Sequence, residues 1–242
     1  MPDLLLLSNS TSPGMGFLEH ARGVISELIG PGGRMLFVPF AGFDHDRYTQ
    51  VMTDALAPLS IQVTGAHEVS DPVTALDGCD AVFVGGGNSF RLLRALEDTG
   101  LKAAIPGRVR AGLPYLGASA GTNMACPTLR TTNDMPIVQP ASFDALGLIP
   151  FQVNPHYLDA DPASTHQGET RAQRIAEFLQ CNAVPVLGLR EGSWLAVRGR
   201  RASLGGGSPA RLFTRDAPGG TEMAPGTDVS ELLSTVPRYD TR

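Results

Sequence analysis

The chain has 242 residues, of which 42% are hydrophobic and 18% charged, so it can bury a sizeable core and is not compositionally disordered. Its 19 basic and 24 acidic residues give a net charge of −5 without any Lys/Arg block, which argues against a nucleic-acid-binding surface. The three cysteines are scattered, and no apolar run is long enough for a signal peptide or a membrane helix. We therefore expect one α/β domain over residues 1–242, located in the cytoplasm and not in a membrane.

Short apolar runs that end in Gly, Ser, Asn or Pro predict buried strands at residues 4–7, 35–38, 81–84 and 113–116. Helical stretches lie between or beside them, at residues 17–29, 47–56, 90–97 and 101–110. This alternation predicts βαβ units, and hence a three-layer α/β sandwich in which helices cover both faces of a largely parallel sheet. Functional sites in such sheets lie at the carboxyl ends of the strands.

The second half of the chain is less regular. A polar loop at residues 127–136 precedes a predicted strand at 151–153, a helix at 169–179, and strands at 184–189 and 194–197. Residues 199–201 are typical of a hairpin turn, and residues 200–242 carry no motif that indicates a chemistry.

The most informative motif is the G-x-S-x-G pattern of residues 117–121, which has Ser119 at its centre and lies between a predicted strand and a short helix. A sharp strand-to-helix turn lifts the serine hydroxyl out of the sheet, and the two glycines leave room for crowded backbone. Backbone N–H groups at the start of that helix, such as the one of Ala120, favour a developing oxyanion. The pattern predicts a nucleophile, with an ordinary Gly/Ser turn as the alternative.

A serine nucleophile needs a general base. His156 follows the predicted strand at 151–153, so we expect it at the same sheet edge as Ser119. His166, in the next polar loop, is a weaker candidate. The segments around the remaining histidines look like ordinary helix or strand positions: His20, His45 and His67.

Two carboxylates could orient the base. Asp134 lies in the polar loop after the short helix, and Glu191 follows the predicted strand at 184–189. Either could accept the imidazole N–H, and either is equally typical of a solvated loop acid. The residues alone leave both alternatives open.

A glycine-rich loop, Gly85-Gly86-Gly87-Asn88, joins the predicted strand at 81–84 to the following helix. Backbone donors at a helix N-terminus suit a phosphate or an oxyanion. The loop lacks the lysine of a phosphate-binding P-loop, so we expect the N–H of Gly86 or Gly87 to serve as a second oxyanion donor. The alternative is a tight turn capped by Asn88.

Seven segments form a distinctive ordered set: Leu5-Leu6-Leu7-Ser8-Asn9-Ser10, Gly85-Gly86-Gly87-Asn88, Gly117-Ala118-Ser119-Ala120-Gly121, Thr131-Thr132-Asn133-Asp134-Met135-Pro136, Asn154-Pro155-His156, Gly168-Glu169-Thr170-Arg171 and Glu191-Gly192. Together they resemble peptidase E, the α-aspartyl dipeptidase family, over about residues 3 to 200. The resemblance implies a cofactor-free and metal-free serine peptidase with a glutamine-amidotransferase-like (flavodoxin-like) α/β sandwich. It also implies hydrolysis of small peptides, namely dipeptides whose first residue is aspartate.

The resemblance also implies roles for single residues. The family's nucleophile falls on Ser119 and its base on His156. Asp134 and Glu191 both match positions of the third triad member, and we favour Glu191 for its place at a strand end. Asp134 could instead bind the α-amino group of the substrate, and Asn88 is expected among the substrate-binding residues.

An acidic protein that binds an acidic substrate needs a fixed cation. Arg171 opens the helix after the His156 loop, and its guanidinium fork suits bidentate binding of a β-carboxylate. A solvated arginine paired with Glu169 or Asp159 is the alternative. In that case the candidates would be Lys102, Arg130 and Arg190.

Two other functions stay open. One is a related serine hydrolase that acts on aspartyl polymers, as cyanophycinase does, or on esters. The other is a non-catalytic module that binds a nucleotide or phosphate at residues 85–88. The oligomeric state is also open, and a homodimer is one option.

Overall fold

The computed structural model describes residues 2–163, 165 and 167–241, and a seven-stranded sheet forms the centre of this part of the chain. The strand order is β3-β2-β4-β5-β1-β8-β9. The bounds are β1 (Asp3–Leu7), β2 (Arg34–Val38), β3 (Gln62–Gly65), β4 (Ala81–Val84), β5 (Tyr115–Ala118), β8 (Ser193–Arg198) and β9 (Arg201–Gly206). Strands β1 to β5 run parallel, and β8 and β9 are antiparallel, so the predicted largely parallel sheet is confirmed.

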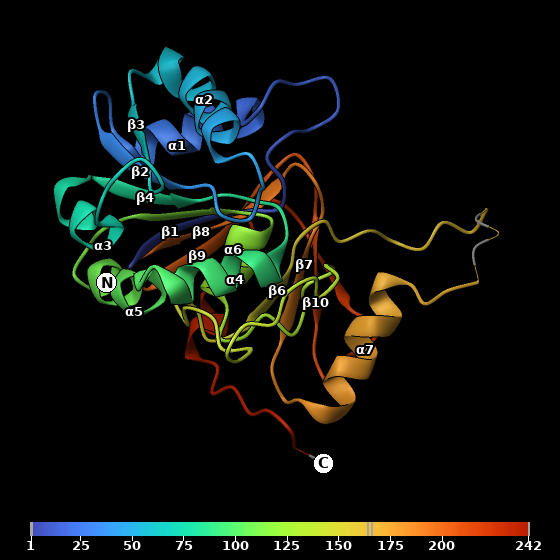
Figure 1. Cartoon of the computed structure of the whole chain (residues 1–242). Coiled ribbons are helices and arrows are strands. Elements are labelled where there is room, and N and C mark those ends of the chain that lie inside the picture. The colour runs from blue at the N-terminus through green and yellow to red at the C-terminus, as the bar shows by residue number, and fades with distance from the viewer. Residues whose placement is uncertain (1, 164, 166, 242) are drawn as a thin grey trace.

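Helices cover both faces of this sheet, as Figure 1 shows. Helices α1 (Arg22–Ile29) and α2 (His45–Leu56) lie on one face, and α4 (Ser89–Asp98), α5 (Leu101–Arg110) and α6 (Ala120–Ala125) on the other. Side chains of a strand alternate between faces, so Leu5 and Leu7 pack toward α1 and α2 while Leu4 and Leu6 pack toward the other layer. The α/β sandwich expected from the alternating pattern is therefore confirmed.

A second sheet, of four strands, was not predicted. Its order is β11-β10-β7-β6, with bounds β6 (Gln152–Asn154), β7 (Val186–Leu189), β10 (Ala210–Phe213) and β11 (Thr221–Met223). The prediction that the strand before His156 belongs to the same sheet as Ser119 is wrong, because β6 pairs in parallel with β7. Helix α7 (Arg171–Cys181) packs on this sheet through Ile175 and Leu179.

The two sheets nevertheless share one core. Leu4 of β1, Val153 of β6 and Leu187 of β7 belong to the same cluster of buried side chains. This packing brings the carboxyl ends of β6 and β7 to those of β1 and β5. Short elements complete the fold: α3 (Pro72–Ala75) and the 3-10 turns Glu19–Ala21, Ala57–Leu59, Leu76–Gly78 and Ser230–Ser234.

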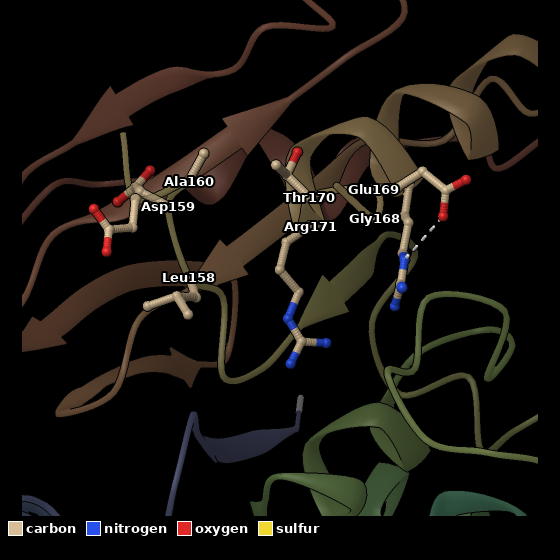
Figure 2. Close-up of a pocket in the computed structure, with 9 residues that line it drawn as sticks. Leu158, Asp159, Ala160, Gly168, Glu169, Thr170 and Arg171 are labelled. Carbon is tan, nitrogen blue, oxygen red and sulfur yellow. Dashed lines mark ion pairs between the residues drawn. The ribbon is translucent and has the colours of Figure 1, made fainter. Parts of the chain in front are cut away.

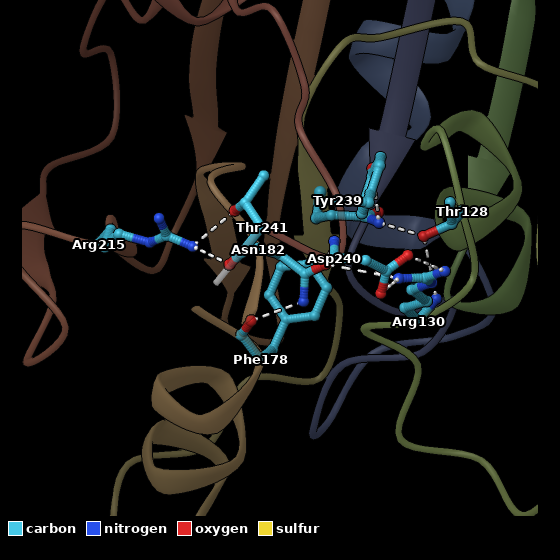
Figure 3. Close-up of polar contacts among 9 residues, drawn as sticks. Thr128, Arg130, Phe178, Asn182, Arg215, Tyr239, Asp240 and Thr241 are labelled. Atoms are coloured by element: carbon cyan, nitrogen blue, oxygen red, sulfur yellow. Dashed lines mark hydrogen bonds and ion pairs between the residues drawn. The ribbon is translucent and has the colours of Figure 1, made fainter. Parts of the chain in front are cut away.

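The last described residues hold α7 against the loop that follows α6 (Figure 3). Arg130 forms a bidentate pair with Asp240 at 2.9 and 3.2 Å, and its guanidinium lies over the ring of Tyr239. Asn182, just after α7, accepts the backbone N–H of Asp240 at 3.1 Å. The described part of this C-terminal segment, residues 200–241, suggested no chemistry from the sequence but contributes strands β9 to β11 and the contacts that hold α7.

Candidate active site

Ser119 lies at the sharp junction between β5 and α6. Its φ of 53° and ψ of −110° are an unusual conformation for a non-glycine residue, and such strain is typical of functional turns. A Cβ on Gly121 would overlap the carbonyl of Val84, and a Cβ on Gly117 would lie 2.6 Å from the carbonyl oxygen of Gly121. Both glycines of the motif are therefore required by close packing, as the nucleophile-elbow hypothesis expects.

The Ser119 hydroxyl is part of a hydrogen-bonded chain of three side chains. Its Oγ lies 3.0 Å from Nε2 of His156, and Nδ1 of the same ring lies 2.7 Å from Oε1 of Glu191. The side chains of His156 and Glu191 are 39% and 50% exposed, so the site is open to solvent. The arrangement has the geometry of nucleophile, base and orienting acid.

The topology explains why these residues meet. His156 follows β6 and Glu191 follows β7 at the same distance, and because the two strands are parallel neighbours their carboxyl ends coincide. Ser119 reaches them from the first sheet, where β5 pairs in parallel with β1. The contact between Ser119 and His156, which was predicted at the edge of one sheet, therefore forms between two sheets.

The predicted oxyanion donors differ in availability. The N–H of Gly86 donates to the Tyr48 hydroxyl at 2.8 Å, so this donor is already used. Within the described part of the chain, the N–H groups of Gly87 and Ala120 have no hydrogen-bond partner. Gly87 adopts a φ of 133°, and a Cβ at this position would lie 2.5 Å from the Ala41 carbonyl oxygen, so the position favours glycine. Of the predicted donors, Gly87 and Ala120 therefore suit an oxyanion best.

Asp134 is not a hydrogen-bond partner of the His156 ring, whose two nitrogens contact Ser119 and Glu191. Its Oδ2 instead accepts the N–H of Ser89 at 2.7 Å, the Ser89 hydroxyl at 2.6 Å and the Thr132 hydroxyl at 3.2 Å. The contacts therefore favour Glu191 over Asp134 as the orienting acid. Asp134 remains available, through Oδ1, for a cationic group.

Asn88 has a structural role at the start of α4. Its Oδ1 accepts the N–H groups of Phe90 and Arg91, and its Nδ2 donates to the carbonyl of Met135 at 2.9 Å. One amide hydrogen is left for a ligand. The capping alternative considered for this loop is thus realised, and a major contribution of Asn88 to substrate binding is not favoured.

Arg171 is the first residue of α7 and lines a cavity of about 580 Å³ beside the triad. The cavity is lined by His156, Tyr157, Leu158, Asp159, Arg171, Arg190 and Glu191. Figure 2 shows the Arg171 guanidinium pointing away from Asp159 and Glu169, its two expected partners in the alternative interpretation. In the described ranges no carboxylate forms an ion pair with Arg171.

The electrostatic environment of Arg171 favours the binding of an anion. Partial burial lowers the pKa of its guanidinium, the charge of Arg174 adds to this, and the carboxylate of Asp134 acts in the opposite direction. An arginine stays charged despite such a shift. A half-buried positive charge is stabilised by an incoming carboxylate.

The other cations considered for this role already have acidic partners. Lys102 pairs with Glu97 at 2.9 Å, and Arg130 pairs with Asp240. Arg190 contacts Asp159 at 2.7 Å and Glu222 at 2.8 Å, and these contacts raise its pKa. Arg171 is therefore the best placed of the four to bind a substrate carboxylate.

Comparison with known proteins assigns the family. The model described as peptidase family S51 matches residues 4–205. The chain belongs to this family. It is 62% identical to "Peptidase E" of Streptomyces coelicolor, over 99% of this chain and 98% of that protein. It is 49% identical to "Probable alpha-aspartyl dipeptidase" of Drosophila melanogaster, over 96% and 97% of the two chains. The predicted family and the predicted enzyme class, a peptidase, are confirmed.

Solved structures agree with the fold of this S51 peptidase. A crystal structure from Listeria monocytogenes EGD-e matches with a TM-score of 0.66 and 25% identity, over 86% of this chain and 100% of that chain. A peptidase from an acI-B1 Actinobacterium matches with a TM-score of 0.69, over 95% and 96% of the chains, and at 16% identity it supports the fold alone.

The sequence did not point to two residues that hold the backbone of the site in place, Tyr48 and Ser8. Tyr48 is 38 positions from the glycine whose N–H it accepts, and Ser8 is 148 positions from His156, whose N–H it accepts at 2.9 Å. Ser8 lies in a segment that carried the family resemblance, and that was the available signal.

The weaker base candidate, His166, lies outside the described residues. No helix in the described ranges has the length and apolar character of a membrane span.

Proposed function

We propose that this S51 peptidase hydrolyses dipeptides with an N-terminal aspartate, through an acyl-enzyme on Ser119. The observation that carries the proposal is the hydrogen-bonded chain Ser119–His156–Glu191 beside an arginine without an acidic partner among the described residues. The names of the two relatives cited above, peptidase E and α-aspartyl dipeptidase, support the same substrate class.

Substrate recognition rests on two opposite charges. Arg171 binds the β-carboxylate of the first residue, and a desolvated charge-assisted pair compensates for the protein's net charge of −5. The α-ammonium group binds Asp134. The carboxylate of Asp134 opposes the lowering of the pKa of Arg171, which supports placing the substrate aspartate near both side chains.

In the first chemical step, the Ser119 oxygen attacks the carbonyl carbon of the peptide bond while His156 Nε2 removes the hydroxyl proton. Glu191 accepts the hydrogen bond from Nδ1–H and stabilises the imidazolium. The tetrahedral intermediate collapses, and Nε2–H gives the proton to the leaving amine. The second amino acid departs, and an aspartyl ester remains on Ser119.

In the second step, His156 removes a proton from a water molecule that attacks the ester carbonyl. The second tetrahedral intermediate releases aspartate and returns the proton to Ser119. In both steps the oxyanion accepts hydrogen bonds from the N–H groups of Ala120 and Gly87, and each such donor contributes about 3 kcal/mol to the lowering of the barrier.

A substrate panel tests this proposal against the related hydrolases. Asp-Leu, Asn-Leu, a longer peptide with N-terminal aspartate, an aspartyl polymer and a p-nitrophenyl ester are compared at equal concentration. We expect cleavage of Asp-Leu with a large preference over the isosteric Asn-Leu. Preference for the polymer or the ester would favour the cyanophycinase-like or esterase function instead.

A serine reagent tests the proposal against the non-catalytic alternative. A fluorophosphonate should give one adduct, which peptide mapping places on Ser119. Absence of an adduct, together with thermal stabilisation by a nucleotide, would favour a module that binds phosphate at residues 85–88.

We further propose that residues 1–242 act as a single catalytic domain in the cytoplasm. The shared core of the two sheets supports the first statement. Sedimentation of the purified protein would decide between a monomer and the homodimer considered from the sequence.

A further inference from the structure

Two consecutive buried polar residues at the end of β1, Ser8 and Asn9, have no role in the mechanism above. Their exposed fractions are 0% and 1%. Burying polar side chains is costly unless each is hydrogen-bonded, so their partners indicate what they do.

The Ser8 hydroxyl is bonded on both sides. It accepts the backbone N–H of His156 at 2.9 Å and donates to the carbonyl of Leu189 at 2.8 Å. His156 has a φ of 52°, a conformation that persists in a non-glycine residue only when the surroundings hold it. Ser8 thereby fixes the backbone of the base relative to the end of β7.

Asn9 fixes the turn that carries Glu191. Its Oδ1 accepts the N–H of Gly192 at 2.8 Å, and its Nδ2 donates to the carbonyl of Thr11 at 2.8 Å. The turn is closed by a hydrogen bond from the N–H of Ser193 to the carbonyl of Arg190 at 3.1 Å. Glu191 lies inside this turn, so its backbone cannot shift without breaking the contact with Asn9.

The preceding residue, Leu7, completes the pattern, because its carbonyl accepts the N–H of Ser119 at 3.1 Å. Leu7 thus contacts the backbone of the nucleophile, Ser8 contacts the backbone of the base, and Asn9 contacts the turn that carries the acid. This matters because the base and the acid belong to one sheet and the nucleophile to the other.

We propose that Ser8 and Asn9 are positioning residues that hold His156 and Glu191 in line with Ser119 across the two sheets. The proposal rests on the triad assigned under the proposed function. Both side chains are buried, so we expect their loss to lower kcat and to leave KM nearly unchanged. A misplacement of about 1 Å in a catalytic group can cost about a hundredfold in rate.

The kinetic experiment compares Ser8→Ala and Asn9→Ala with matched controls. Ser230 also accepts a backbone N–H at 2.9 Å, from Ala202, and Asn182 is 5% exposed and accepts the N–H of Asp240. We expect kcat for Asp-Leu to fall about tenfold to a hundredfold in the first pair, with KM changed less than about twofold. Ser230→Ala and Asn182→Ala should retain the parent kcat.

Two further variants separate positioning from folding. Ser8→Thr keeps the hydroxyl and should recover most of kcat. Ser8→Cys nearly keeps the side-chain volume, but its thiol forms only weak hydrogen bonds. This variant should therefore fold and have a low kcat even if Ser8→Ala does not fold. An equal loss of kcat in Ser8→Thr and Ser8→Ala would overturn the proposal. An equal loss of kcat in the control variants and the test variants would also overturn it.

A readout that does not depend on the substrate keeps this proposal distinct from the proposed function. The proton between His156 Nδ1 and Glu191 should give a downfield ¹H NMR resonance, identified by its loss in His156→Ala. We expect it to be lost or weakened in Ser8→Ala and Asn9→Ala and kept in the controls. If the wild-type protein cleaves no Asp-X dipeptide, the resonance still decides the positioning role. Its full retention in both test variants would contradict the proposal.

Discussion

The Nδ1 atom of His156 lies 2.7 Å from Oε1 of Glu191, although 35 positions separate the two residues in the chain. They meet because β6 and β7 are parallel neighbours, with Asn154 of β6 paired with Gly188 of β7 near their carboxyl ends. Asp134, the competing carboxylate, is occupied at the start of α4 by Ser89 and Thr132. The two acids should therefore have separable kinetic roles.

Exchange of each carboxylate for its isosteric amide tests this separation. Glu191→Gln removes the charge that stabilises the imidazolium, and we expect kcat to fall about a hundredfold or more with KM little changed. Asp134→Asn should mainly raise KM for Asp-Leu, because it removes the partner of the substrate ammonium group. Steady-state kinetics check both. A larger fall in kcat for Asp134→Asn than for Glu191→Gln would contradict the assignment.

The role of Arg171 is tested against a neighbouring arginine. Arg171→Met should lower kcat/KM for Asp-Leu by about 2–4 kcal/mol, because a partly buried charge-assisted pair is lost. Labelling of Ser119 by a fluorophosphonate should continue. Arg174→Met is the control, since Arg174 is exposed and 3.9 Å from Glu169. Unaltered kinetics in Arg171→Met would exclude Arg171 from substrate binding.

Helical glycines offer a test of the elbow packing. Gly121→Ala places a Cβ against the Val84 carbonyl, whereas a Cβ on Gly107 of α5 meets nothing within 4 Å. Gly121→Ala should destabilise the protein by at least about 1–3 kcal/mol or prevent folding, and Gly107→Ala should stabilise it by about 0.4–1 kcal/mol. Urea unfolding measures both. Tolerance of alanine at Gly121 would show that the backbone of the elbow has room for a side chain.

Acid should weaken the contacts of Asp159, which pairs with Arg190 and Arg211 near the cavity. The hydrogen bond from Arg190 is the main cause that holds the pKa of Asp159 below its ordinary value of 3.8. The folded-state pKa is thus the lower one, so the stabilisation is present above pH 3.8 and is lost as pH falls through the folded-state value.

Asp159→Asn is the variant that measures this contribution. Its unfolding free energy should be lower than that of the parent at pH 7, and the difference should shrink toward pH 2. The effect should be modest because the Asp159 side chain is 43% exposed. A difference that grows on acidification would mean that the ion pairs do not lower the pKa of Asp159 in the folded state.

Local signals in the sequence were sufficient to predict the sharp strand-to-helix turn at Ser119. The strand, the crowded glycines and the helix start are all contiguous around Ser119, so one short pattern contains the physical requirement. The sequence also predicted that His156 and Glu191 lie near Ser119, because each follows an apolar strand, and the structure places the His156 ring within hydrogen-bond distance of both other side chains. The predicted strand at 113–116 was two residues early, since β5 extends to Ala118 and leads straight into the elbow.

Non-local pairing explains what the sequence did not predict. Apolar strands at 151–153 and 184–189 look alike whether they join the first sheet or form a second, and only their partners differ. Strand β11 has the burial pattern of an exposed edge, without an apolar run to mark it. Tyr48 and Ser8 act on residues far along the chain, and such contacts leave no local pattern.

The identity of the nucleophile is the central claim, and the rate of Asp-Leu cleavage by Ser119→Ala tests it most directly. The variant removes one oxygen atom from a side chain at a turn whose backbone is held by Leu7, so the fold should be retained, as circular dichroism would verify. We predict that kcat/KM falls by at least about a thousandfold relative to the parent protein. Cleavage of Asp-Leu by folded Ser119→Ala at the parent rate would contradict the account.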